Sequence, residues 1–255
     1  SEYAPELGFL PGRDFTTANV LANWYRFTDA HPVFRRVWPG MLAFSTFRNS
    51  DGALESGQYA VWWQWETKAG GGGWIEPKYF HEDVVTPFTI GDVTIPAGRY
   101  DFADLQLALS MNSGARLRTA LDFRSGTYFD GTRTQIALTP TWNASRWLEL
   151  GADYQLSVLR FDERDERENV QVARLRVRTA LDARRSGNAF VQYTSTTGHL
   201  DFNVRLRYAF AEGTDLWMVY NEGLDTERTG DLVGTHSPFS LSRSFILKYT
   251  YTFGL

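Results

Sequence analysis

Arginine recurs at every second position in several segments, with aliphatic or aromatic residues between. The longest example is residues 173–181, ARLRVRTAL, and a shorter one is residues 202–210, FNVRLRYAF. Because successive side chains of a β-strand point to opposite faces, such a segment places guanidinium groups on one face and apolar groups on the other. A row of fixed cations can pair with carboxylates across strands or set the charge of a water-filled constriction.

Carboxylates follow the same alternation in residues 147–158. Glu149 and Asp153 occupy its polar face, and this segment directly precedes the arginine-rich one. We therefore expect ion pairs between the two neighbouring strands. The residues that we expect to line one continuous polar face are Arg116, Arg118, Arg124, Arg133, Glu149, Asp153, Arg174, Arg176, Arg178, Arg205, Arg207 and Lys248.

Long strands are the elements that must position these side chains. The two-residue alternation recurs in about thirteen segments between residues 17–27 and 241–253. Most alternate for the roughly 9–11 residues that a tilted membrane strand needs, whereas soluble strands average about 5–6. Long connections such as 82–98 and 223–240 alternate with tight turns such as 112–114 and 211–214. This pattern is typical of a bacterial outer-membrane barrel.

The sequence therefore predicts an all-β fold, an antiparallel transmembrane β-barrel, with one barrel domain over residues 1–255. Barrels of this kind have an even number of strands and keep both termini in the periplasm. Counting back from the C-terminal strand places residues 1–15 on the extracellular side instead. We therefore expect further strands upstream, which would bring the complete barrel to about 14–16 strands.

Aromatic residues make up 15% of the chain. At strand ends they predict a girdle at the lipid–water boundary, where rings with one polar end are favoured. The alternative is a platform of alternating tryptophans that stacks on sugar rings, as in a soluble all-β carbohydrate-binding protein. The residues assigned to the girdle are Trp63, Trp65, Trp74, Tyr249, Tyr251 and Phe253.

Several kinds of chemistry receive no support from the residues. The chain has no Cys, which excludes thiolate metal sites and thiol catalysis, and its four His lack metal-ligand spacing. A net charge of -4 gives no reason to expect nucleic acid as a partner. The acidic loop 162–168 has no EF-hand spacing. We expect no metal, no cofactor and no enzymatic activity.

Five stretches together resemble a bacterial family of outer-membrane β-barrels of unknown function that follow an N-terminal family-9-like carbohydrate-binding module. The chain departs from the family at Gly12, where a further Arg is expected. The resemblance covers only the barrel, and it implies that the binding module and the first strands lie upstream. It transfers no catalytic residue. The matching stretches are residues 6–15, 86–102, 128–142, 206–223 and 245–253.

Two functions fit this reading. The first is a porin-like channel or uptake component with a lumen lined by Arg, Asp and Glu. The second is a non-conducting barrel that anchors a carbohydrate-binding module or a partner complex in the outer membrane. Either one implies contact with outer-membrane lipid and lipopolysaccharide, and the second adds carbohydrate or a partner protein.

Overall fold

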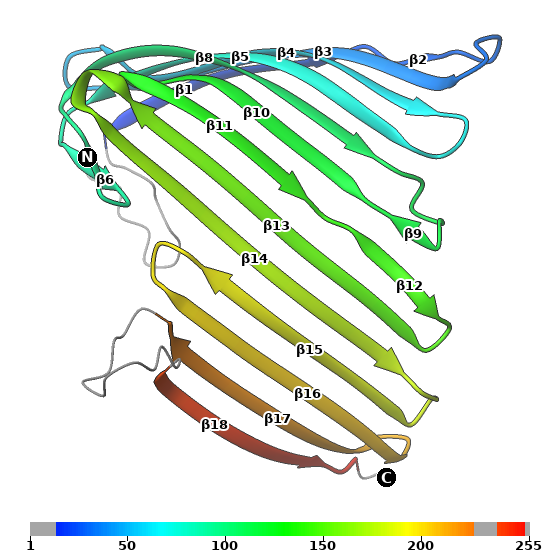
Figure 1. Cartoon of the computed structure of the whole chain (residues 1–255). Coiled ribbons are helices and arrows are strands. Elements are labelled where there is room, and N and C mark those ends of the chain that lie inside the picture. The colour runs from blue at the N-terminus through cyan, green and yellow to red at the C-terminus, as the bar shows by residue number, and fades with distance from the viewer. Residues whose placement is uncertain (1–13, 227–238, 253–255) are drawn as a thin grey trace. The chain divides into compact units, whose positions relative to one another are not determined.

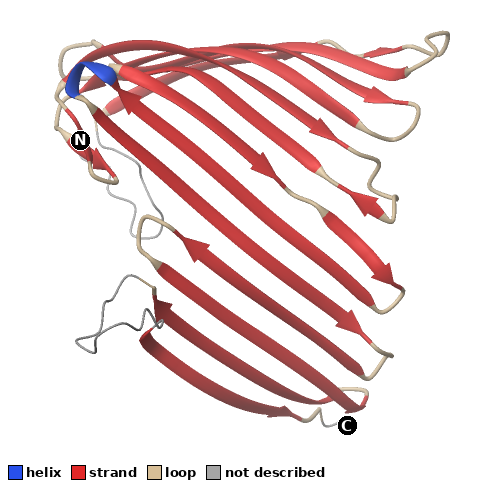
Figure 2. Ribbon diagram, viewed as in Figure 1, coloured by secondary structure: helices blue, strands red, loops and turns tan. Residues whose placement is uncertain are grey.

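The structure is a computed structural model that describes residues 14–226 and 239–252. Within these residues it is built of β-strands in antiparallel pairs, with one short 3₁₀ turn, η1 (Asp162–Arg164) (Figure 2). The all-β, antiparallel prediction is therefore confirmed. The first strands are β1 (Phe15–Asn23), β2 (Arg26–Phe27), β3 (Phe34–Arg48), β4 (Leu54–Thr67), β5 (Gly72–Val84), β6 (Phe88–Ile90), β7 (Val93–Ile95) and β8 (Gly98–Ser110).

The remaining strands are β9 (Leu117–Arg118), β10 (Ala120–Tyr128), β11 (Gly131–Leu138), β12 (Thr141–Ser145), β13 (Leu148–Phe161), β14 (Glu166–Ala180), β15 (Arg185–Thr194), β16 (His199–Ala211), β17 (Thr214–Asp225) and β18 (Phe239–Thr250). Among the described residues, hydrogen-bonded neighbours follow the order β1-β3-β4-β5-β8-β10-β11-β13-β14-β15-β16-β17-β18 (Figure 1). Each of these thirteen strands matches one predicted segment. The sequence period thus located the strands because each keeps its alternation over most of its length.

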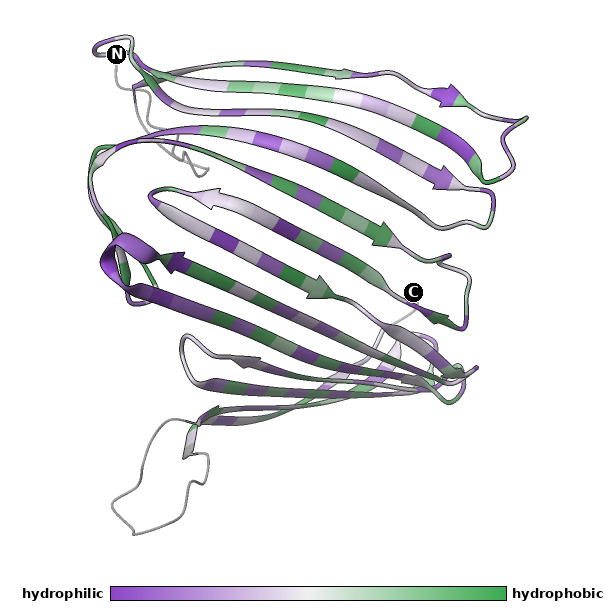
Figure 3. Ribbon diagram, turned by 45° about the horizontal axis from the view of Figure 1, so that its top comes forward, coloured by the Kyte–Doolittle hydropathy of each residue, from purple (hydrophilic) through white to green (hydrophobic). Residues whose placement is uncertain are grey.

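The chain divides into two compact units. The first holds residues up to 110 together with 122–135 and 158–168, and the second holds 111–121, 136–157 and the residues from 169 on. Figure 3 shows hydrophilic and hydrophobic residues alternating along the strands of both units.

Two predicted strands are interrupted at one place in the second unit. The segment expected at 132–142 breaks between β11 and β12, and the segment expected at 115–124 breaks between β9 and β10. Pro140 lies in the first break and has no N–H to donate to a neighbouring strand. Its carbonyl still accepts a hydrogen bond from the Ala152 amide at 2.9 Å. The ladder resumes directly after it, with Thr141 opposite Arg118.

Connection lengths are less regular than the sequence suggests. Residues 85–97 and 226–238 separate long strands, as expected, but strand extension shortens two other predicted long loops to 49–53 and 162–165. At the opposite strand ends, the 181–184 turn is held by Asp182. Its carboxylate accepts a hydrogen bond from the Arg185 guanidinium at 2.8 Å, and this bond and the bond from the Arg184 amide hold the pKa of Asp182 below its usual range.

A hairpin, β6–β7, forms inside the connection 85–97, which we expected to be a plain loop. Ile90 pairs with Val93 around a two-residue Gly-Asp turn, and Gly91 has a φ of 59°. Glycine occupies this left-handed conformation at no steric cost. A Cβ at Gly91 would also lie 2.7 Å from the Glu168 carboxyl carbon. The alternation of Phe88, Ile90, Val93 and Ile95 around this turn is a hairpin signal.

The hairpin covers the best-buried cluster of the first unit. Val93 and Ile95 pack against Leu159 and Phe161, all four at 3% exposure or less. Tyr100 and Phe129 pack around this core, with ring centroids 5.2 Å apart.

The Arg164 side chain holds the hairpin against neighbouring segments. The Arg164 guanidinium donates to the Thr94 carbonyl and lies 3.2 Å from the Asp130 carboxylate and 4.5 Å from the Phe161 ring. The hairpin is therefore held by both apolar packing and charge.

Truncation of Ile95 tests this packing. We expect Ile95→Ala to lower the free energy of local opening of the hairpin by about 2–4 kcal/mol, because buried methyl groups are lost and a cavity remains. Hydrogen exchange of the amides of residues 88–95 measures this change. Leu105→Ala is the matched control, since Leu105 is 43% exposed. Unchanged exchange in Ile95→Ala would contradict the packing described.

Candidate functional site

Asp104 is the centre of the charged face in the first unit. Its side chain is 2% exposed and lies opposite Lys78 on the neighbouring strand. One carboxylate oxygen accepts from both Arg124 and Arg133, the second at 2.9 Å. The strands approach closely here, because a Cβ at Gly126 would collide with the backbone of Asp104. Burial without these two guanidinium groups would be costly, so the three side chains form one unit.

Polar contacts extend from this centre along the same face. Lys78 lies 3.1 Å from the Glu76 carboxylate and donates to Gln106 at 2.6 Å. Gln106 donates in turn to Asp122 at 2.5 Å. Phe80 lies under the Arg124 guanidinium, 5.4 Å from it. The polar face of the first unit is thus closely matched in charge.

The second unit contains the predicted ion pairs between β13 and β14. Glu149 accepts from Arg118 at 3.0 Å and from Arg178 at 3.2 Å. Arg176 lies 3.6 Å from the Asp153 carboxylate. Pairing across these two strands is therefore confirmed. It leaves the arginines in excess, because Glu149 is shared between two of them.

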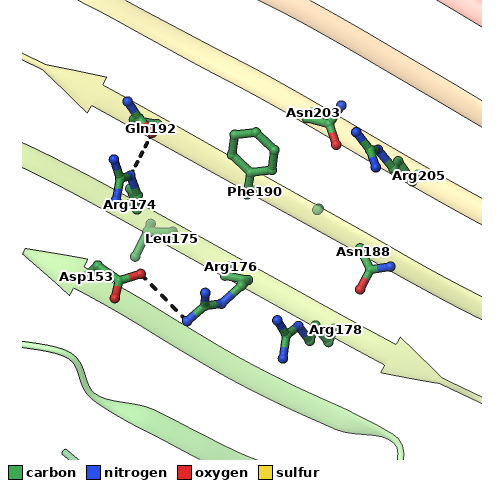
Figure 4. A pocket seen from close by; sticks show the side chains of 11 residues that line it. Asp153, Arg174, Leu175, Arg176, Arg178, Asn188, Phe190, Gln192, Asn203 and Arg205 are labelled. Atoms are coloured by element: carbon green, nitrogen blue, oxygen red, sulfur yellow. Dashed lines mark hydrogen bonds and ion pairs between the residues drawn. The ribbon is translucent and has the colours of Figure 1, made fainter. Parts of the chain in front are cut away.

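An open hollow of about 500 Å³ lies over β14, β15 and β16 of this unit (Figure 4). We call it the arginine hollow. Direct pairing places Arg176, Phe190 and Asn203 in one row across the three strands, and Arg178, Asn188 and Arg205 in the next. The residues that line it are Asp153, Arg174, Leu175, Arg176, Arg178, Asn188, Ala189, Phe190, Gln192, Asn203 and Arg205.

The lining of the arginine hollow is strongly cationic. Four arginines stand against one carboxylate, Asp153. Arg174 donates to the neutral amide of Gln192 at 2.7 Å, as the dashed line in Figure 4 shows. Arg205 has no side-chain hydrogen bond or ion pair to any residue within 14–226 and 239–252. Guanidinium groups held on neighbouring strands without matching carboxylates form a site of positive potential that attracts anions.

Three other predicted lining residues have different surroundings. Arg116 precedes β9, and its guanidinium donates to the backbone carbonyls of Asn143 and Ala144, so it braces a turn. Arg207 pairs with Asp215 at 2.8 Å. Lys248 lies opposite Trp217 in the β17–β18 ladder.

The predicted girdle residues do not all share a face. Trp63 lies opposite Ile75 and Trp65 opposite Gly73, whereas Trp74 lies opposite Gln64. Trp74 therefore belongs to the polar face, and its grouping with Trp63 and Trp65 is wrong. A ring near a strand end can lie on either face of the sheet, because the register decides the face.

Tyr249 packs 6.3 Å from the Phe210 ring on the apolar face of the second unit. Tyr251 follows β18 and is exposed. Phe253 lies outside the described residues. The role of these aromatic residues at a lipid boundary stays a prediction.

Sequence reasoning missed the neutral members of the polar face. Phe190, Asn188 and Gln192 lie beside the arginines, but their segment, 187–196, alternates poorly in sequence. Trp62 is a fourth such residue, on the polar face of the first unit, and its ring lies over Gly40, where a Cβ would collide with it. The first three residues could be found only from their pairing with the arginine-rich strand β14. That pairing follows from the strand register, which the alternation within one segment does not give.

No group of three or more His, Asp or Glu side chains that could hold a metal ion occurs in the described part of the chain. Among those residues no helix has the length and hydropathy needed to span a membrane. The arrangement is suited to binding and guiding charged solutes, since its side chains are fixed cations, amides and one exposed ring.

Comparison with solved structures finds a likeness to a porin. The NanC porin, solved in a rhombohedral crystal form, aligns with 92% of this chain and 99% of its own, at 9% identity and a TM-score of 0.32. No protein-family model matches the sequence. No curated protein matches it.

We expect the ion pairs of Asp104 and of Asp153 to contribute differently to the free energy of unfolding. We expect Asp104→Asn to cost about 3–5 kcal/mol of the free energy of unfolding, because it leaves two guanidinium groups without their buried counter-charge. Asp153→Asn is the matched control and should cost about 1 kcal/mol or less, since its pair is partly exposed. Urea unfolding of the protein in detergent micelles measures both values. Equal costs would contradict the central role of Asp104.

Proposed function

We propose that this chain forms a porin-like β-barrel in the bacterial outer membrane and that its charged face lines a water-filled path that favours anions. Strand length supports a membrane span. β3 and β14 have 15 residues each, and β4 and β13 have 14, against the roughly 9–11 that a tilted strand needs. The strands that lie between β1 and β18 in the sheet order each pair with a neighbour on both sides, as hydrocarbon requires of backbone groups.

The second support is the apolar face of each unit. In the first unit Val61, Trp63 and Ile75 are 55%, 46% and 39% exposed, although their register places them side by side. In the second unit Leu175 and Leu247 are both 61% exposed. Soluble proteins rarely leave contiguous apolar surface of this extent uncovered. Lipid chains are the cover that we propose.

Aromatic residues near strand ends agree with a bilayer boundary. Trp63 and Trp65 lie near the 68–71 turn, and Tyr249 lies near the 212–213 turn of the other unit. At the opposite ends of strands, Tyr79 donates to Asp101 at 2.6 Å, and Asp101 also contacts His81 at 2.8 Å. Aromatic rings toward both strand ends, of which Tyr79 has a polar partner, are suited to headgroup levels.

The observation that carries the anion preference is the arginine hollow. Its four arginines face one carboxylate, and Arg205 has no counter-charge among the described residues. Rings and rows of arginine at a constriction select anions by lowering the energy of negative charge there. The hairpin β6–β7 packs on the polar face of the first unit. In the proposed channel it would narrow the water-filled path along that face.

Ion selectivity tests the channel. In planar bilayers with a salt gradient we expect a reversal potential that indicates anion preference. Arg174→Leu should reduce the anion-to-cation permeability ratio by about two- to fivefold, because it removes one fixed charge from the hollow. Arg99→Gln is the control, since Arg99 is 73% exposed and lies outside the hollow. Conduction with unchanged selectivity would mean that the arginines only brace the wall.

A non-conducting barrel is the second candidate. Dense pairing around Asp104 in the first unit and around Glu149 in the second also suits a plugged lumen. The resemblance to barrels that follow a carbohydrate-binding module supports an anchoring role. No ion flow in bilayers, with partners or polysaccharide recovered from intact membranes, would favour this candidate. Extraction without detergent would favour a soluble carbohydrate-binding protein instead.

A further inference from the structure

We propose that the arginine hollow is a binding site for a sugar that carries a carboxylate group. The proposal rests on the function above only in that the hollow must face water. Its volume, about 500 Å³, lies in the range of small-molecule sites. Three kinds of group line it, and each recognises a different part of such a sugar.

The first kind is the guanidinium group that is not already neutralised. Arg205 makes no side-chain hydrogen bond or ion pair within the described residues, and there the Arg174 guanidinium is bonded only to the neutral Gln192. The Nε of Arg176 is buried without a hydrogen-bond acceptor in the same part of the chain. These groups can take the two oxygens of a ligand carboxylate in parallel hydrogen bonds, a geometry that arginine favours.

The second kind is a single aromatic ring. Phe190 is 40% exposed and stands between Arg176 and Asn203 in one cross-strand row of the hollow. An exposed ring there contributes nothing to ion pairing. The C–H face of a pyranose ring can cover it and remove apolar surface from water, whereas an inorganic anion or a short dicarboxylate cannot do so as fully.

The third kind is the side-chain amide. Asn188 lies between Arg178 and Arg205 in the cross-strand row and makes no side-chain hydrogen bond to a described residue. Asn203 is 8% exposed and is held in place by Asn221. An amide offers both a donor and an acceptor, which matches a sugar hydroxyl. Carboxylate, ring face and hydroxyls together define an acidic sugar.

Binding to the folded protein in detergent micelles tests the proposal by titration calorimetry. The probes are sodium glucuronate, glucose, which lacks the charge, and succinate, which lacks the ring. We expect glucuronate to bind at least about tenfold more tightly than either of the others. Similar affinity for glucuronate and succinate would overturn the sugar assignment.

Two variants with matched controls locate the site. Phe190→Ala should weaken glucuronate about tenfold and leave succinate unchanged, whereas Phe202→Ala, on the opposite face beside Val191, should change neither. Arg205→Gln should weaken both acids about tenfold, and Arg99→Gln should weaken neither. Circular dichroism verifies that each variant keeps its strands. Unchanged glucuronate binding in both Phe190→Ala and Arg205→Gln would overturn the proposal.

This test is separate from the test of conduction. A protein that conducts anions but binds glucuronate no better than succinate keeps the proposed function and refutes the ligand. A protein that binds glucuronate at Phe190 and Arg205 but passes no current keeps the ligand and refutes the channel.

Discussion

Antiparallel backbone pairing places each residue directly opposite one partner, and the two side chains then share a face. The charged face depends on this geometry. Arg176, Phe190 and Asn203 form one row only because β14, β15 and β16 keep one register. A slip of one residue would replace Arg176 by an apolar neighbour and move the guanidinium to the opposite face. The register is therefore as important for the site as the identity of its residues.

The polar faces of the two units organise their charges in two different ways. Around Asp104 the carboxylate is buried, and two guanidinium groups compensate for its lost hydration. Around Arg205 the strands offer more cations than anions, and the surface stays open to solvent. The first arrangement is suited to holding strands together, because an unpaired charge there would be costly. The second leaves positive potential available to a solute. The polar face of the first unit is thus suited to bracing strands, and that of the second unit to binding a ligand.

The hairpin β6–β7 packs on the polar face of the first unit and covers part of it. Ile95 and Phe161 are among the best-buried side chains in the described residues, and Tyr100, which packs against them, precedes Phe102 and Asp104 on the same face of β8. This apolar core holds the hairpin against the polar face of the first unit without a covalent link. The apolar face differs, since its exposed side chains have no protein cover. Two solvents, water and hydrocarbon, account for the two faces more simply than one.

The strand pattern was determined by the sequence itself. Alternation with a period of two residues located thirteen strands and indicated which residues of β13 and β14 would pair, because this period is a local property of the chain. The break at Pro140 was also encoded locally, since proline has no N–H. Residues 88–95 also carry a hairpin pattern in the sequence, with alternating apolar residues on both sides of Gly91. This pattern lies within a long connection, which by its length alone predicts a plain loop.

Only the tertiary structure decided how the faces are composed. The place of Trp74 on the polar face, the excess of arginine over carboxylate, and the position of Phe190 beside Arg176 all depend on cross-strand register. Burial of Ile95 against Phe161 depends on segments more than 60 residues apart in the chain. Pairing between distant strands is a sum of many weak contacts over the whole sheet. The pattern of a single strand therefore shows which of its residues share a face. It does not show which residues of neighbouring strands lie beside them.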